Sequence, residues 1–188
     1  MKRLAVYCGS SMGSAPHYAE RARALGATMA ARGVDLVYGG GHRGLMGVIA
    51  DSVLAGGGKA YGVIPRALVD LEVAHRGLTE LHVVETMHER KAMMTELTDA
   101  FVAIPGGVGT LDELFEAWSW NALGYHAKPF ALLNEEGFWD EMLAFLDTTV
   151  KSGFVSQSRR DQLLVAASPD ETIDILTAAA GREAGMVW

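Results

Sequence analysis

Two cationic side chains stand next to each other in the segment Met87 to Met94, and the first lies where a charge is costly. At helical spacing, Arg90 shares a face with Met87, Met94 and Leu97. A guanidinium on an apolar helix face needs an anion to compensate for its lost hydration. Lys91 borders the same face and supplies a second cation. Two interpretations stay open: Arg90 pairs with a structural carboxylate, or it serves a phosphate or a catalytic carboxylate.

The stretch from Pro105 to Glu113 reads Pro-Gly-Gly-Val-Gly-Thr-Leu-Asp-Glu and is the most specific in the chain. Free N–H groups from Gly107 to Thr110 at a helix start form a cradle for phosphate. An acid on the first helical turn then stands about one sugar length from that phosphate, where it stabilises a ribosyl cation or activates water, as in glycoside hydrolysis. Thr110 and Glu113 also have capping-box spacing, so a plain helix cap contributing about 1 kcal/mol is the alternative.

Three loops that are expected to follow strands are rich in glycine: residues 9–13, 39–47 and 106–109. Glycine lets main-chain N–H groups approach an anionic ligand closely, although in any single loop it also simply permits a tight turn. Three such loops at one edge of a sheet favour a phosphate-bearing ligand.

Standard nucleotide signatures are absent from the sequence. Neither Gly-x-Gly-x-x-Gly after the first strand nor Gly-x-x-x-x-Gly-Lys-Ser/Thr occurs, which leaves a dinucleotide cofactor and P-loop chemistry unsupported. Residues 9–13 match the Gly-x-Ser-x-Gly nucleophile elbow around Ser11. That elbow would follow the first strand, with no earlier strand to supply an oxyanion loop, so a serine-rich turn that donates to phosphate or sugar is the favoured interpretation.

The elements that must position these residues alternate between strand and helix. Apolar runs predict strands over 4–7, 34–38, 60–64, 81–84, 101–104, 130–133 and 163–166. Helical periodicity predicts helices over 18–31, 45–54, 87–97, 110–123 and 138–151, and a last helix capped by Ser168. Residues 66–79 are expected to form a loop with a short helix. This order predicts a single Rossmann-like α/β domain over residues 1–188, a doubly wound parallel sheet with helices on both faces.

Length, charge and composition exclude several classes of protein. A chain of 188 residues with 16 Lys+Arg and 23 Asp+Glu has a formal net charge of −7, which argues against a partner such as DNA or an anionic membrane. The single cysteine, Cys8, excludes an internal disulfide framework and a cysteine-based metal site. No apolar run reaches the length of a membrane span, and we expect a cytoplasmic protein.

Two motifs together resemble the LONELY GUY family of cytokinin riboside 5′-monophosphate phosphoribohydrolases, proteins often mislabelled as lysine decarboxylases. The motifs are Met87-His88-x-Arg90-Lys91 and Pro105-Gly106-Gly107-x-Gly109-Thr110-x-x-Glu113. The likeness covers most of the chain; further matching segments are Cys8 to Ser11, Tyr38 to Gly41, Glu72 to His75, Lys128-Pro129 and Leu132 to Asn134.

The resemblance implies hydrolysis of the N-glycosidic bond of a nucleoside 5′-monophosphate to free base and ribose 5-phosphate. It implies that Arg90 and Glu113 are the catalytic pair. It also implies a substrate-binding set of Ser10, Ser11, Gly40, Gly41, Glu72, Lys91, Gly107, Val108, Gly109, Thr110, Leu111, Asp112 and Ser119. We expect no cofactor, no metal ion and a homodimer. Val108 and Asp112 depart from the usual residues of the plant relatives, which puts base selectivity, but not the main-chain phosphate cradle, in question.

Two other interpretations compete with a hydrolase. Carriers of the molybdenum cofactor resemble the chain in their glycine loops and only hold a ligand. A lysine decarboxylase would need a Schiff-base lysine with a pyridine partner, and no lysine of this chain has that setting. Free adenine released from AMP distinguishes the hydrolase from the carrier.

Overall fold

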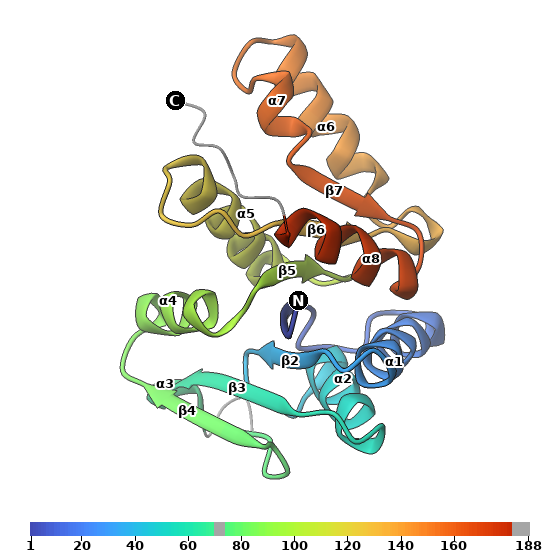
Figure 1. The fold of residues 1–188 in the computed structure, drawn as a ribbon, viewed down its shortest axis with the longest axis vertical. Helices are drawn as coiled ribbons and strands as arrows, with labels where there is room; N and C mark the ends of the chain where they lie inside the picture. Colours follow the sequence, from blue (N-terminus) through green and yellow to red (C-terminus); the bar gives the residue numbers. More distant parts are fainter. Residues whose placement is uncertain (70–73, 182–188) are drawn as a thin grey trace.

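Seven parallel strands form one sheet in the computed structural model, which describes residues 1–69 and 74–181 (Figure 1). The strands are β1 (Arg3–Tyr7), β2 (Asp35–Tyr38), β3 (Ala60–Pro65), β4 (Glu80–Val84), β5 (Ala100–Ala103), β6 (Phe130–Leu133) and β7 (Leu163–Ala166). Their order is β4-β3-β2-β1-β5-β6-β7, and every pair is parallel. The predicted fold class is therefore confirmed.

Helices connect the strands at nearly every crossover. They are α1 (Pro16–Ala31), α2 (Gly44–Ala55), α3 (Arg66–Val69), α4 (Met87–Leu97), α5 (Val108–Ala122), the 3₁₀ turn η1 (Glu135–Gly137), α6 (Asp140–Lys151), α7 (Gln157–Arg160) and α8 (Pro169–Ala180). The short helix α3 lies in the segment for which a loop with a short helix is expected, whereas α7 is not predicted. None of the described helices is long and apolar enough to cross a membrane.

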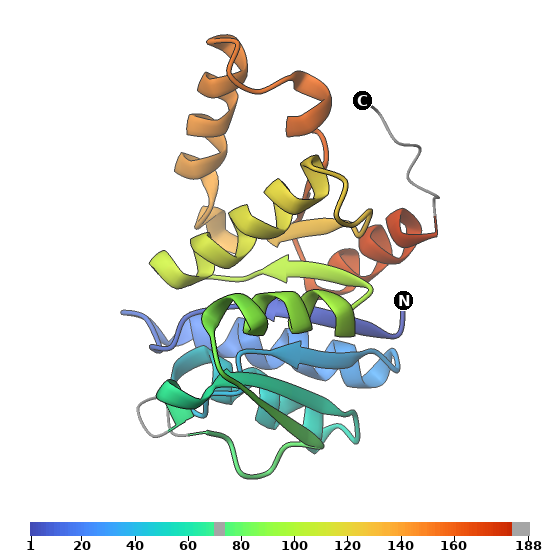
Figure 2. The same ribbon diagram turned by 90° about the vertical axis from the view of Figure 1, so that its left-hand side faces the viewer.

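Helices cover both faces of the sheet, and successive side chains of each strand point alternately into the two cores that result. In β1, Leu4 and Val6 pack into a cluster with α1, α2 and α8, whereas Ala5 and Tyr7 pack into a second cluster with α4, α5 and α6. Figure 2 shows α4 and α5 side by side over the second face. The central strands are consequently buried on both sides, which explains their continuous apolar sequences.

The strand order reverses between β1 and β5. The chain moves outward from β1 to β4 and then returns to place β5 beside β1. At such a switch point the loops that follow the two strands diverge, and the crevice between them is where ligands of α/β proteins bind. The loops after Tyr7 and Ala103 begin there, and both are rich in glycine.

Candidate active site

The three glycine loops meet at the carboxyl edge of the sheet, as the sequence predicts. The Gly9 N–H donates to the Pro105 carbonyl at 3.1 Å, and a Cβ added to Gly9 would lie 3.4 Å from the Gly106 Cα. Gly44, with a φ of 60°, lies so close to the Ser10 main chain that any side chain there would overlap it. These close approaches bring the loops after β1, β2 and β5 into one site.

Arg90 is buried at the centre of this site, with 5% of its surface exposed. It lies in the first turn of α4, which begins after Thr86, whose hydroxyl accepts from the Glu89 N–H at 3.1 Å. Arg90 Nη2 donates to the Gly39 carbonyl at 3.3 Å, and Nη1 approaches Met87 Sδ at 3.5 Å. A Cβ at Gly39 would overlap Nη2, so only glycine leaves room for this guanidinium.

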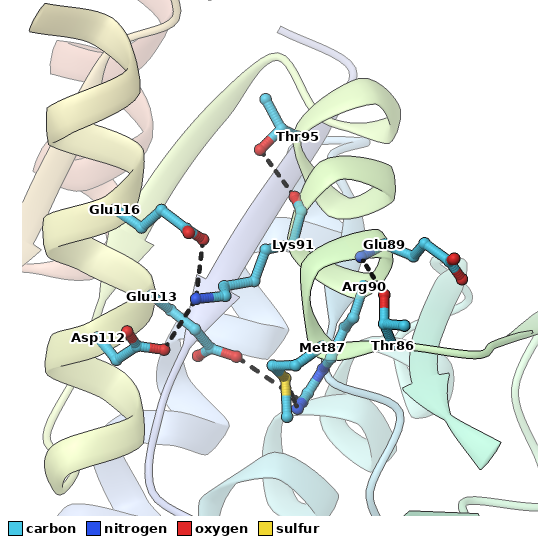
Figure 3. A network of polar contacts seen from close by, with 9 residues as sticks. All are labelled: Thr86, Met87, Glu89, Arg90, Lys91, Thr95, Asp112, Glu113 and Glu116. Atoms are coloured by element: carbon cyan, nitrogen blue, oxygen red, sulfur yellow. Dashed lines mark hydrogen bonds and ion pairs between the residues drawn. The ribbon is translucent and has the colours of Figure 1, made fainter. Parts of the chain in front are cut away.

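The anion that compensates Arg90 is Glu113. Arg90 Nη2 lies 3.7 Å from Glu113 Oε1, and both side chains are largely buried (Figure 3). Arg90 Nε is buried as well and has no hydrogen-bond partner among the described residues. The two motifs that the sequence singles out therefore form one charged pair, and Arg90 Nε has no acceptor among the described residues.

Helix α5 begins two residues earlier than predicted, and this settles the capping alternative. Its N-cap is Gly107, and none of the described side chains caps it by a hydrogen bond. Thr110 is buried inside the helix, so the alternative of a capping box formed by Thr110 and Glu113 is excluded. No described atom would come within 4 Å of a Cβ at Gly107 or Gly109, so the first turn faces open space. This geometry leaves a helix N-terminus available to an anion.

Lys91 faces two carboxylates of α5. Its Nζ lies 3.0 Å from Asp112 Oδ2 and 2.9 Å from Glu116 Oε2 (Figure 3). Burial lowers the pKa of Lys91, but the hydrogen bonds and charges of Glu116 and Asp112 outweigh it and hold the pKa above its ordinary value. Lys91 thus stays charged and joins α4 to α5, an arrangement unsuited to a Schiff-base nucleophile.

Tyr7, which the sequence analysis did not single out, lies beneath this charged cluster. Burial raises the pKa of Tyr7 well above its ordinary value, Glu113 and Glu116 raise it further, and Arg90 opposes them. Tyr7 therefore remains a neutral phenol that stacks on Phe101 at a centroid distance of 5.8 Å. Its position as the last residue of the first strand, directly before the loop at the switch point, is the signal that would have found it.

The remaining predicted substrate-binding residues fall into three groups. Ser10 and Ser11 are exposed in the loop after β1, and Gly40 and Gly41 are buried in the loop after β2. The α5 residues Val108, Leu111 and Asp112 lie within its first two turns, and Val108 is 84% exposed. Glu72 lies outside the described residues, and its role stays a prediction.

Ser119 lies apart from the charged pair. It lines a groove of about 330 Å³ between α5 and the segment that contains α6 and α7. The described lining residues are Phe115, Trp118, Ser119, Ala122, Leu146, Thr149, Phe154, Val155, Ser156 and Arg159. No other described residue of the predicted substrate-binding set borders this groove.

The sequence is similar to those of known proteins. Residues 46–176 match the family model described as "Possible lysine decarboxylase". The cytokinin riboside 5′-monophosphate phosphoribohydrolase LOG of Oryza sativa subsp. japonica is 44% identical over 188 residues, 100% of this chain and 78% of the rice protein. An Arabidopsis thaliana protein described as a cytokinin riboside 5′-monophosphate phosphoribohydrolase is 45% identical over 172 residues, 92% of this chain and 81% of that protein.

Solved structures share the fold at lower identity. A molybdenum cofactor binding protein from Rippkaea orientalis has a TM-score of 0.71 and 22% identity over 94% of this chain and 95% of its own. The molybdenum cofactor carrier protein of Chlamydomonas reinhardtii has a TM-score of 0.72 and 22% identity over 96% of this chain and 98% of its own. At this identity the likeness shows the fold alone.

Fold and site together define a Rossmann-like α/β protein with an Arg–Glu pair at the switch point of its sheet. The matched family model and the relatives at 44–45% identity, which match over most of this chain, identify the family as well as the fold. The chain belongs to the LONELY GUY family of phosphoribohydrolases, the family that the model describes as possible lysine decarboxylases, and it is a hydrolase.

Proposed function

We propose that this protein hydrolyses the N-glycosidic bond of adenosine 5′-monophosphates, including N6-modified ones, to free base and ribose 5-phosphate. The observation that carries the proposal is the buried Arg90–Glu113 pair, 3.7 Å apart, beside the open first turn of α5. It places a carboxylate on the same helix whose open N-terminus offers an anion site. The full-length relatives named for this activity support the same substrate class.

The 5′-phosphate binds at the N-terminus of α5 in this proposal. Main-chain N–H groups from Gly107 to Thr110 donate to its oxygens, and the helix dipole favours its negative charge. Ser10 and Ser11, exposed at the neighbouring loop, are placed to add hydroxyl donors. Since Lys91 already pairs with two carboxylates, the main chain supplies most of the attraction.

Glu113 acts at the anomeric carbon. As the bond from C1′ to the base nitrogen breaks, its electron pair leaves with the base, and the ribose ring takes on oxocarbenium character. The Glu113 carboxylate stabilises that positive charge and accepts a proton from the water that attacks C1′. The departing base takes up a proton from solvent and the Glu113 proton returns to solvent, so one water is consumed for each free base and ribose 5-phosphate formed. Arg90 orients the carboxylate, because its Nη2 lies 3.7 Å from Glu113 Oε1.

The base lies toward the entrance of the crevice, where the protein offers little contact area. Val108 is 84% exposed and is smaller than the aromatic residue usual in plant relatives. We therefore propose that adenine and N6-modified adenines are both accepted, with a weaker preference among them than a closed pocket would give.

We also propose that the protein is a cytoplasmic homodimer. Large apolar side chains are exposed around the Ser119 groove and the end of α5: Leu123 is 67%, Tyr125 75% and Phe154 87% exposed. Exposed apolar side chains of this size are typical of a protein–protein interface. A second copy of this chain is the partner that would cover it.

A panel of nucleotides tests the proposed activity. Purified protein is incubated with AMP, N6-isopentenyl-AMP, ADP, ATP and the free nucleosides, and released bases are separated by chromatography. We expect free base from the monophosphates alone, because the nucleosides lack the group that α5 binds. Equal cleavage of the nucleosides would contradict the phosphate cradle, and nucleotide binding without base release would identify a carrier instead.

A further inference from the structure

His75 lies in a polar network that the proposed chemistry does not use. Its side chain is buried, with 7% of its surface exposed, although it lies in an irregular segment before β4. His75 Nε2 lies 2.9 Å from Asp51 Oδ1 on α2, and the Gly77 N–H donates to Nδ1 at 3.1 Å. Both ring nitrogens are therefore engaged by groups from different parts of the chain.

These contacts fix the tautomer of His75. A main-chain N–H only donates, so Nδ1 accepts from Gly77 and carries no proton. In the neutral ring the proton then lies on Nε2 and is donated to the Asp51 carboxylate. Asp51 thereby anchors the ring, and with it residues 74–77, to helix α2.

The main chain around His75 holds the loop after β2. The His75 N–H donates to the Gly40 carbonyl at 3.0 Å, and Ala74 forms an antiparallel bridge with Gly41. The loop contains three consecutive glycines, Gly39 to Gly41, whose main chain is little restricted by itself, so contacts from outside the loop help to hold its conformation.

This loop packs directly against Arg90. Gly39 precedes Gly40, and its carbonyl accepts a hydrogen bond from Arg90 Nη2 at 3.3 Å. A Cβ at position 39 would overlap the same nitrogen. A shift of the loop would move the acceptor that orients the guanidinium, and with it the 3.7 Å approach to Glu113. An unbroken series of contacts thus joins Asp51 to Arg90.

We propose that His75, anchored by Asp51, is a positioning residue for Arg90 and acts through the Gly39–Gly41 loop. The proposal rests on the proposed function, because its effect is expressed as turnover. It predicts a loss in kcat with little change in KM. The phosphate is held by α5, which the network does not touch, whereas the alignment of Arg90 with Glu113 depends on it.

The experiment compares four variants with wild-type protein by AMP turnover and thermal unfolding. Asp51→Ala and His75→Ala remove the anchor, and we expect each to lower kcat about tenfold with KM within about twofold. Asp51→Asn keeps an oxygen acceptor for Nε2–H, and we expect near-normal kcat. Asp174→Ala is the matched control: Asp174 is as exposed as Asp51 and pairs with Arg32, at the far end of α1.

Asp51→Ala keeps the test decisive if His75→Ala fails to fold, because the Asp51 side chain is 64% exposed. Unchanged kcat in folded Asp51→Ala, a rise in KM alone, equal losses in Asp51→Asn, or an equal loss in Asp174→Ala would each overturn the proposal. A wild-type protein that does not cleave AMP would instead refute the proposed function. Amide hydrogen exchange then tests the network itself: the His75 N–H, which donates to the Gly40 carbonyl, should exchange faster in Asp51→Ala, and unchanged exchange would overturn the proposal.

Discussion

At the scale of single residues, the site depends on how closely a guanidinium approaches the main chain. Arg90 donates to the Gly39 carbonyl and pairs with Glu113 through the same nitrogen, Nη2. Because both groups are buried, the loss of either interaction would destabilise the folded protein. No water is available to replace the missing partner of the charge. The glycine at position 39 is therefore as important for the pair as the charged residues themselves.

A methyl group at Gly39 tests this packing. A Cβ there would overlap Arg90 Nη2, so Gly39→Ala must displace the guanidinium. We expect AMP turnover to fall about 100-fold, the size of effect that a misplacement of about 1 Å produces in an active site. Initial rates measured beside Gly181→Ala, where the nearest atom to a new Cβ is 3.7 Å away, provide the control. Normal turnover in Gly39→Ala would show that the observed Arg90 position does not matter.

Cys8 lies next to the site in sequence but is chemically inert. Burial raises the pKa of its thiol, Glu113 adds to the effect and Arg90 opposes it, so almost no thiolate is present at neutral pH. We expect iodoacetamide at pH 8 to leave Cys8 unmodified in the folded protein and to alkylate it rapidly in urea, as followed by mass spectrometry. Rapid alkylation of the folded protein, with loss of activity, would point to an exposed and reactive thiol.

At the scale of elements, the capping of a helix N-terminus determines whether its free N–H groups can bind an anion. The N-terminus of α5 has Gly107 as its N-cap, without a side-chain hydrogen bond from any described residue, which suits an anion-binding role. Helix α8 has the opposite design: Ser168 Oγ accepts from the Glu171 N–H at 3.2 Å, and Glu171 in turn accepts from the Ala167 N–H at 2.7 Å. The first helix start is open to a ligand, and the second is closed by its own side chains.

The cap of α8 is a measurable contribution to stability. Ser168→Ala removes the acceptor for the Glu171 N–H, and we expect the free energy of unfolding in urea to fall by about 1 kcal/mol. Ser152→Ala, at an exposed position after α6, serves as the comparison and should change stability by less than about 0.5 kcal/mol. Equal values for the two variants would mean that the Ser168 hydrogen bond does not stabilise the helix.

The sequence predicts most elements because buried parallel strands and amphipathic helices have distinct periods. The predicted limits of the strands over 130–133 and 163–166 and of the helix over 87–97 agree with β6, β7 and α4. Helix α5 begins at Val108, two residues before the predicted start, because Gly107 and Gly109 give no helical signal in the sequence. Helix α7 was missed because four residues are too short for a periodic signal.

The sequence motifs of the site were predictable, but most of the tertiary contacts that their side chains make were not. Spacing on α4 and α5 singled out Arg90 and Glu113, but not the carbonyl of Gly39 or the buried phenol of Tyr7, which depend on how the sheet brings distant loops together. The two carboxylates that engage Lys91 are likewise a tertiary feature, since they lie 21 and 25 residues further along the chain. Long-range packing of this kind leaves no local pattern.

At the scale of the whole molecule, the apolar surface around α5 to α7 predicts an assembly. Phe154 is 87% exposed at the edge of the Ser119 groove, so its replacement costs the folded monomer little. We expect Phe154→Asp to shift the mass measured by light scattering from a dimer to a monomer without lowering the melting temperature. A wild-type protein that is monomeric at working concentration would refute the dimer directly.

The central claim is that Glu113, paired with Arg90, carries the chemical step while main-chain groups bind the phosphate. The most direct measurement is adenine release from AMP by Glu113→Gln, with AMP affinity measured by calorimetry on the same samples. We predict at least a 100-fold loss of kcat, within the range expected for a positioned acid–base group, at nearly unchanged affinity. Glu116→Gln, one turn further along α5 and paired with Lys91, should retain most of the activity. Turnover by Glu113→Gln close to that of wild type would contradict the account.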